Sequence, residues 1–268
     1  REELLAEAGS RYAPASPCDG LRRAGNDLGQ WVFIGKPCDA AGVRKAQQSS
    51  NGQIKEIGVV ISIFCAGTPS TQGTIDLLEK MVVPIDKVRS VRYRGNGWPG
   101  KFSVATHGDA DTKKELTYRE AWSFLQKYRP YRCYLCPDGT GEFADISCGD
   151  SWYREINADE EGHSLILVRT ERGQQILQNA ITAGFIKAER ATPEILEKSQ
   201  VNLFSKRAAV WGRILAFKVF GLPTPRYAGF PLFRDWQTLS PLEMARSIFG
   251  TMRRIVQRQY FMPQRNSR

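Results

Sequence analysis

The sequence has no long hydrophobic run and very little histidine. Its longest nearly apolar stretch is the eleven residues from Ile57 to Gly67, whereas a membrane-spanning helix needs about 18. The only two histidines, His107 and His163, leave little room for histidine-based zinc sites or a Ser-His-Asp triad. Internal repeats and low-complexity tracts are also lacking. The 268 residues are 41% hydrophobic and 25% charged, which excludes a wholly disordered chain and allows one large domain or two modest ones.

The net charge of +10 belongs to the last quarter of the chain. From Leu196 onward there are 13 Lys and Arg against 3 Asp and Glu, whereas the preceding residues hold 25 of each sign. No nucleic-acid-binding motif accompanies this charge, so nucleic acid is disfavoured as a partner. Two interpretations stay open. The segment can form helices with a solvated basic face, or it can dock an acidic partner such as a ferredoxin or an anionic membrane surface.

The chain begins with Arg1, and no apolar signal segment is visible at its start. Residues Arg1 to Ala8 have the pattern of a helix. We therefore expect a natural start upstream of Arg1, and a cytoplasmic protein.

Hydrophobic patterning predicts an α+β fold, an α/β-like mixed sheet flanked by helices, followed by a helical and basic C-terminal segment. The predicted strands are Trp31–Gly35, Gly58–Cys65, Val88–Arg94, Lys101–His107, Ala144–Cys148, Ser164–Thr170 and Phe185–Arg190. The predicted helices are Ala40–Gln48 with Asp39 as N-cap, Thr74–Met81, Tyr118–Tyr128, Arg172–Ala183, and those from Thr192 to Tyr260. We expect a domain over residues 1–190 and a helical extension over 191–268.

Four of the six cysteines suggest a shared site. Cys133 and Cys136 form a CxxC motif, while Cys38 and Cys65 follow the first two predicted strands. Chemistry in α/β sheets gathers at the carboxyl ends of strands, and CxxC presents two sulfurs on one side of a turn. Four thiolates can close a tetrahedral metal site or an iron–sulfur cluster.

Spacing alone leaves several interpretations of these cysteines open. An iron–sulfur cluster, a zinc ion, and free or redox-active thiols all fit, and structural disulfides would need a secreted protein. Zinc more often uses two local pairs than one pair with two scattered cysteines. Cys18 and Cys148 are left over, and Cys148 is expected as a small core residue on its strand.

Two glycine-rich stretches can approach a ligand closely. Gly95–Gly100 formally matches GxGxxG, but Pro99 lies inside it and a strand follows, so a dinucleotide-binding Rossmann motif is rejected. The stretch is either a broad hairpin turn or a backbone approached by a flat or phosphorylated ligand, with Arg94 and Lys101 as flanking cations. The second stretch, Pro137–Glu142, follows the CxxC directly.

The residues at these places resemble a known family. The matching motifs are Gly35–Asp39, Ile63–Pro69, Arg94–Lys101 and Cys133–Asp150, in this order. Together they resemble the coenzyme F420 hydrogenase/dehydrogenase beta-subunit family over about residues 1 to 190. That family also includes 7-hydroxymethyl chlorophyll a reductase and divinyl chlorophyllide reductase.

The resemblance implies a flavoprotein with FAD beside a 4Fe–4S cluster. It places the cluster ligands at Cys38, Cys65, Cys133 and Cys136. It places flavin contacts at Arg94, Gly95, Asn96, Gly97, Gly100 and Lys101, with further contacts expected at Asp138, Gly139, Gly141 and Glu142. Cys148 stands where the family has an aliphatic residue, and the family's smaller N-terminal domain is not seen in this sequence. No catalytic residue is assigned.

The implied function is an oxidoreductase. Electrons would pass between a ferredoxin or another iron–sulfur protein and a small-molecule two-electron acceptor through FAD. The resemblance allows the deazaflavin coenzyme F420, a tetrapyrrole or another acceptor. Lys101 or Arg94 would stabilise negative charge on the flavin. The alternative is a non-catalytic, zinc-stabilised interaction module with a basic docking surface.

Overall fold

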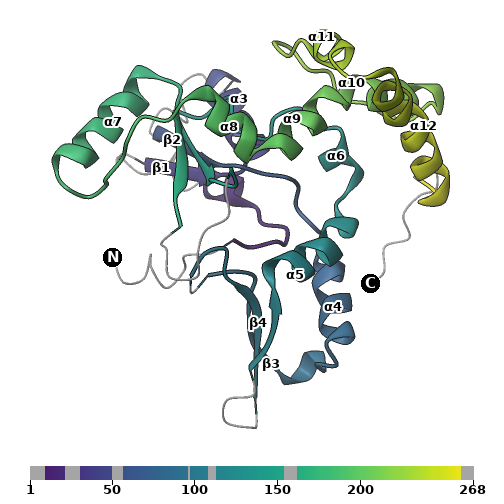
Figure 1. The fold of residues 1–268 in the computed structure, drawn as a ribbon, viewed down its shortest axis with the longest axis horizontal. Helices are drawn as coiled ribbons and strands as arrows, with labels where there is room; N and C mark the ends of the chain where they lie inside the picture. The colour runs from purple at the N-terminus through teal and green to yellow at the C-terminus, as the bar shows by residue number, and fades with distance from the viewer. Residues whose placement is uncertain are drawn as a thin grey trace.

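The computed structural model describes residues 10–21, 31–49, 57–95, 97–107, 113–153 and 162–260. They form two β-sheets, helices against each sheet, and a group of helices toward the C-terminal end (Figure 1). The predicted α+β class is confirmed. The helix predicted over Arg1–Ala8 lies outside the described residues.

The first sheet has four strands and carries the two single cysteines at its carboxyl edge. Its order is β1 (Trp31–Gly35), β2 (Ile57–Ile63), β6 (Ile146–Asp150) and β7 (Ser164–Val168). Strands β1, β2 and β6 are parallel, and β7 joins antiparallel to β6. This is the mixed sheet that the sequence predicts. Because the parallel strands end at one edge, the residues that follow β1 and β2 are brought together there.

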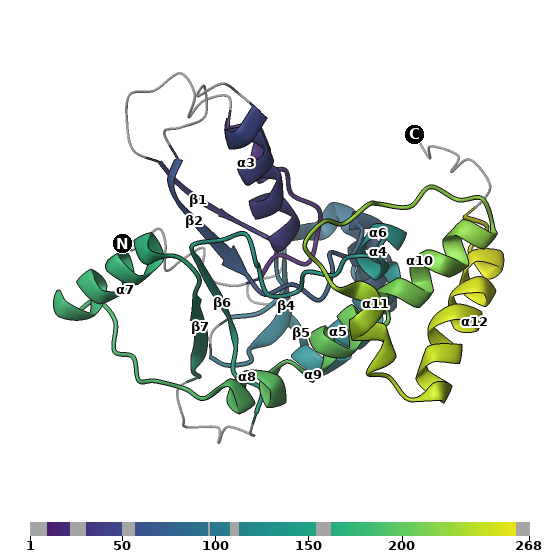
Figure 2. The same ribbon diagram turned by 90° about the horizontal axis from the view of Figure 1, so that it is seen from above.

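Helix α3 (Pro37–Ser49) covers one face of this sheet (Figure 2). Its Ala40 and Val43 are fully buried against Phe33 of β1 and Val60 of β2. The predicted N-cap at Asp39 is wrong, because the helix already begins at Pro37. The Asp39 carboxylate instead accepts the Lys36 backbone N–H at 2.9 Å from inside the first turn.

The second sheet is antiparallel, with order β3 (Val88–Arg92), β4 (Lys101–Thr106) and β5 (Lys113–Thr117). It packs on α4 (Thr71–Lys80) and α5 (Tyr118–Leu125). The fully buried members of the core between them are Leu77, Phe102, Val104 and Leu125. The sequence does not predict strand β5, because its residues are mostly charged and only one of its side chains is partly buried.

The strand predicted over Phe185–Arg190 is wrong. Helix α7 (Glu171–Thr182) precedes this segment, which is irregular and pairs with neither described sheet. Phe185 is 84% exposed. Its apolar residues suggested burial, but burial on a strand also requires a neighbour to satisfy the backbone hydrogen bonds.

The C-terminal segment is helical, as predicted. It contains α8 (Pro193–Ser199), α9 (Val201–Ala208), α10 (Val210–Val219), α11 (Leu232–Gln237) and α12 (Pro241–Gln257). Figures 1 and 2 both place α10 to α12 beside the short helix α6 (Tyr131–Tyr134). No helix in the described part of the chain is long and apolar enough to span a membrane.

Candidate functional site

The four predicted ligand cysteines gather at the carboxyl edge of the first sheet. Cys38 lies in the first turn of α3, directly after β1, and Cys65 lies in the loop after β2. Cys133 lies in α6, and Cys136 lies two residues after the end of that helix. The backbone N–H of Cys65 donates to the Gly139 carbonyl at 2.8 Å, which ties the loop after β2 to the loop after the CxxC.

The thiols lie close enough to influence one another's ionisation. Burial raises the pKa of Cys38 to about 12, with smaller contributions from the charges of Asp39, Cys65 and Cys136. Burial also raises the pKa of Cys65 and Cys136, while the nearby Lys206 ammonium acts in the opposite direction on both. Such thiols stay protonated unless a cation replaces the proton.

The cysteines do not form a closed metal site as they stand. Among the residues that the structure describes, no group of three or more His, Cys, Asp or Glu side chains is arranged to hold a metal ion. All six cysteines are free thiols.

The C-terminal helices hold the CxxC segment in place. Leu135, between the two cysteines, is completely buried against Phe217 of α10 and Ile255 of α12. Its carbonyl accepts a hydrogen bond from the Tyr227 hydroxyl at 2.9 Å. The carbonyl of Tyr134 accepts one from Nη1 of Arg213 at 2.9 Å. The basic segment is therefore part of the cysteine site as well as of the surface.

The predicted ligand-binding residues after the CxxC serve the loop itself. The buried Asp138 carboxylate accepts backbone N–H groups from Thr140, Gly141 and Glu142 at 2.7 to 3.1 Å. Gly141 has φ +75°, and a Cβ there would lie 2.6 Å from the side chain of Ser62. Glu142 forms an ion pair with Arg207 of α9. Asp138, Gly139, Gly141 and Glu142 thus support the cysteine loops, and none of them lines the cavity described below.

Arg94 of the glycine loop is buried in an ion pair. Its guanidinium donates two hydrogen bonds to the Asp150 carboxylate, at 2.7 and 3.0 Å, and a third to the Pro99 carbonyl. Nε1 of Trp98 donates to the same carboxylate at 2.8 Å. Arg94 therefore fixes the loop onto β6. Arg94 is not among the residues that line the cavity described below, but its guanidinium carbon lies 5.0 Å from the centre of the Tyr118 ring and 5.7 Å from that of Trp152.

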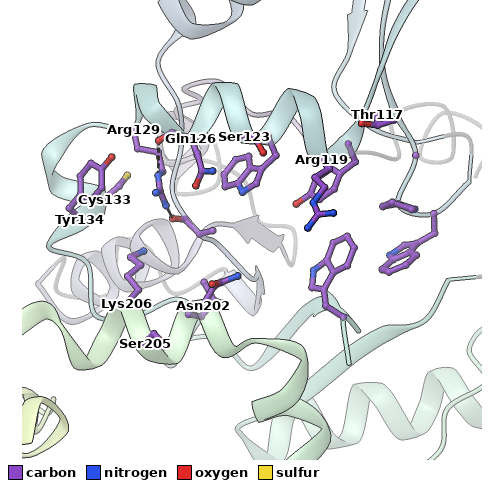
Figure 3. Close-up of a pocket in the computed structure, with 18 of the residues that line it drawn as sticks. Thr117, Arg119, Ser123, Gln126, Arg129, Cys133, Tyr134, Asn202, Ser205 and Lys206 are labelled. Carbon is purple, nitrogen blue, oxygen red and sulfur yellow. Dashed lines mark hydrogen bonds between the residues drawn. The ribbon is translucent and has the colours of Figure 1, made fainter. Parts of the chain in front are cut away.

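A cavity of about 1590 Å³ extends from the glycine loop to Cys133. At one end it is lined by Gly97, Gly100 and Lys101, and at the other end by Cys133. Figure 3 shows Arg119, Ser123, Gln126 and Arg129 on one side of it and Asn202, Ser205 and Lys206 of α9 on the other. Gly95 is not among the lining residues, and Asn96 lies outside the described residues.

Aromatic rings form the wall near the glycine loop. Trp98 lies 4.5 Å from Trp152, which stacks on Tyr118 at 5.3 Å and 15° between ring planes. All three rings line the cavity. Gly100 closes the loop with φ +78°, where a Cβ would lie 2.4 Å from the backbone nitrogen of Gly95. The loop is therefore folded tightly on itself, and its Trp98 ring forms part of the aromatic wall.

The sequence does not predict that cations line the helical side of this cavity. They are Arg119, Arg129, Lys206, Arg213 and Arg254. A signal existed for Arg213, because it interrupts the mostly apolar sequence of α10, and a charge at such a position is often directed into a site. Nothing local separates Arg254 from its exposed neighbour Arg253.

Comparisons with known proteins place the chain in a family. Residues 29–194 match the family model for the C terminus of the coenzyme F420 hydrogenase/dehydrogenase beta subunit. The chain is 28% identical to the coenzyme F420 hydrogenase subunit beta of Methanothermobacter thermautotrophicus, over 84% of this chain and 76% of that protein. It is 30% identical to the coenzyme F420-dependent sulfite reductase of Methanocaldococcus jannaschii, over 67% of this chain and only 28% of that longer protein.

A solved structure shares the fold. A chain of the F420-reducing [NiFe] hydrogenase complex from Methanosarcina barkeri aligns with a TM-score of 0.60 and 22% identity, covering 84% of this chain and 76% of the other. The overlap supports the element order found here.

Proposed function

The chain belongs to the coenzyme F420 hydrogenase/dehydrogenase beta-subunit family, and from this premise we propose that it is an electron-transferring oxidoreductase subunit with a 4Fe–4S cluster beside FAD. Relatives carry names such as hydrogenase and formate dehydrogenase beta subunits. The observation that carries the proposal is the cavity, because it opens both on the glycine loop and on Cys133.

Cys38, Cys65, Cys133 and Cys136 are the proposed cluster ligands. Their fit rests on the donor set: four thiols from three segments, mutually close, with no disulfide between them. All-thiolate ligation is the usual environment of such a cluster. The Lys206 ammonium, which acts on both Cys65 and Cys136, would offset part of the negative charge of the thiolates.

FAD is the proposed occupant of the cavity. Its flat ring system suits the wall formed by Trp98, Tyr118 and Trp152. The backbone of Gly97 and Gly100 permits close approach, and Lys101 supplies a positive charge at the same end. A cluster carries single electrons and a flavin exchanges one or two, so together they would connect a one-electron donor with a two-electron acceptor.

Coenzyme F420 is the proposed acceptor, because several relatives are named for it. The donor is proposed to be a ferredoxin or an iron–sulfur partner protein. The zinc-stabilised interaction module is the alternative, and it predicts a different metal content.

Anaerobic reconstitution with iron and sulfide, followed by metal and flavin analysis, tests this proposal. We expect about four irons and four sulfides per chain, with FAD bound in addition. Cys136→Ser should lower the iron content strongly. Cys148→Ser is the matched control, because Cys148 is a half-buried thiol on β6 outside the proposed ligand set. One zinc per chain without flavin would overturn the proposal and favour the interaction module.

A further inference from the structure

Three arginines converge at the end of the cavity that lies beside Cys133. Arg129 follows α5, Arg213 lies in α10 and Arg254 in α12, and all three line the cavity. They surround Tyr134, the residue after Cys133. The guanidinium carbons of Arg129 and Arg254 lie 5.1 and 4.8 Å from the centre of its ring.

None of these arginines has a carboxylate partner among the described residues. Arg213 donates to the Tyr134 carbonyl, and Arg129 donates to the carbonyls of Ala66 and Gln126. Other arginines of the site are paired: Arg94 with Asp150, and Arg207 with Glu142 and Asp235.

This arrangement is costly without an anion. Burial and the charges of Arg254 and Arg129 lower the pKa of Arg213 to about 10, so the three guanidinium groups repel one another in a partly dehydrated place. The Tyr134 ring and the carbonyl groups offset some of this cost through cation–π contacts and hydrogen bonds. They leave the net positive charge in place.

We propose that Arg129, Arg213 and Arg254 form a binding site for a phosphate-type oxyanion group of the small molecule that occupies the cavity. A guanidinium presents a planar pair of donors that matches two oxygens of such a group, and groups from three segments can enclose it. The anion site follows from this geometry by itself. Its link to FAD or to the electron acceptor rests on the function proposed above.

Titration calorimetry of the purified chain with inorganic pyrophosphate at low ionic strength tests the site. Wild-type protein should bind pyrophosphate, and Arg213→Gln and Arg254→Gln should each bind it at least tenfold more weakly. Arg253→Gln is the matched control: it removes an exposed charge from the same helix, one residue away, and should change binding less than twofold. The proposal would be overturned if Arg253→Gln and the two cavity variants bound pyrophosphate equally well, or if the wild-type protein did not bind it.

A second experiment, which compares FAD with riboflavin, identifies the molecule that carries the bound oxyanion group. FAD and riboflavin share the ring system, but only FAD carries phosphates. If Arg213→Gln and Arg254→Gln weaken FAD binding and spare riboflavin, the site holds the flavin phosphates. If both flavins bind normally while pyrophosphate binding is lost, the site serves an anionic acceptor.

Loss of fold is separated from loss of the site in the same experiment. Thermal unfolding of each variant is measured first, and Arg213→Lys and Arg254→Lys replace any Gln variant that unfolds. These keep the charge but not the planar donor pair, so weaker pyrophosphate binding is again expected. Pyrophosphate binding needs neither iron nor flavin, so its outcome is independent of the reconstitution experiment.

Discussion

At the scale of single residues, burial separates the two cations of the glycine loop, because each is ion-paired but only Arg94 is buried. Arg94 is held by two hydrogen bonds from its guanidinium to Asp150, which makes it a support for the glycine loop. Lys101 lies at the same loop but lines the cavity, and its side chain is 64% exposed. A paired and buried arginine is poorly placed to meet a ligand. Lys101 is therefore the better candidate for flavin contact.

Lys101→Ala is predicted to weaken FAD binding about threefold to tenfold, the effect of losing one partly exposed cationic contact of about 1 kcal/mol. The matched control is Lys113→Ala. Both lysines pair with Glu115, at 2.9 and 2.7 Å, but only Lys101 lines the cavity. Flavin fluorescence quenching measures the dissociation constants. Unchanged FAD affinity in Lys101→Ala would remove this residue from the proposed flavin site.

The sequence could identify the four proposed cysteine ligands but not the arginine cluster. The cysteines stand out because CxxC is a local motif and because Cys38 and Cys65 follow predicted strands. Arg129 and Arg254 are separated by more than a hundred residues and meet only through packing of α12 beside α6. Likewise, nothing near Arg94 in sequence reveals its partner Asp150. Pairing over such separations depends on tertiary structure.

At the scale of elements, local patterns predicted the apolar strands and failed at a charged one. Strands β1 and β2 have runs of apolar residues, and both lie within two residues of their expected ends. Strand β5 is exposed and charged and gave no such signal. Helix α6 is a single turn inside a turn-rich stretch. Its position depends on the burial of Leu135 between α10 and α12, which no local pattern encodes.

Helix α12 is predicted to stabilise the CxxC segment through Ile255. This side chain is completely buried and packs with Leu135, so Ile255→Ala should lower the free energy of unfolding by about 3 kcal/mol. It should also speed amide hydrogen exchange around Cys133 and Cys136, because Leu135 loses a packing partner. Urea unfolding and exchange measured by mass spectrometry follow the two effects.

The control for this change is Val256→Ala on the same helix. Val256 is 53% exposed, so its truncation should alter stability by less than about 0.5 kcal/mol and leave exchange unchanged. Destabilisation by Ile255→Ala without faster exchange at the CxxC segment would contradict the proposed support by α12.

At the scale of the whole molecule, the structure divides the basic segment into two parts. Lys206, Arg213 and Arg254 line the cavity. A second set is exposed to solvent, and its members on or between α10, α11 and α12 are Lys218, Arg226, Arg234, Arg246 and Arg253. The net charge of the sequence does not distinguish the cations that line the cavity from those that are exposed. Only the second set can act as a docking surface for a macromolecule. The positive charge that a docked partner would contact is therefore smaller than the net charge of the segment.

Electron transfer with an acidic iron–sulfur partner is predicted to slow as salt is added. The exposed cations should attract such a partner over distances set by the screening length, which falls from about 30 Å at 0.01 M to about 8 Å at 0.15 M ionic strength. The second-order rate constant, measured by stopped flow with a reduced ferredoxin, should fall across this range. Reduction by an uncharged dye should not.

Arg246→Gln combined with Arg253→Gln should lower the rate at low salt and flatten its salt dependence, because both side chains are exposed on α12. Lys45→Gln combined with Lys187→Gln removes the same charge from exposed positions outside the C-terminal helices, and it serves as the control. An equal effect of both double variants would mean that net charge, and not a surface on these helices, steers the partner. A rate independent of salt in the wild type would exclude electrostatic docking, leaving the exposed cations as a solvated face that covers the cysteine site.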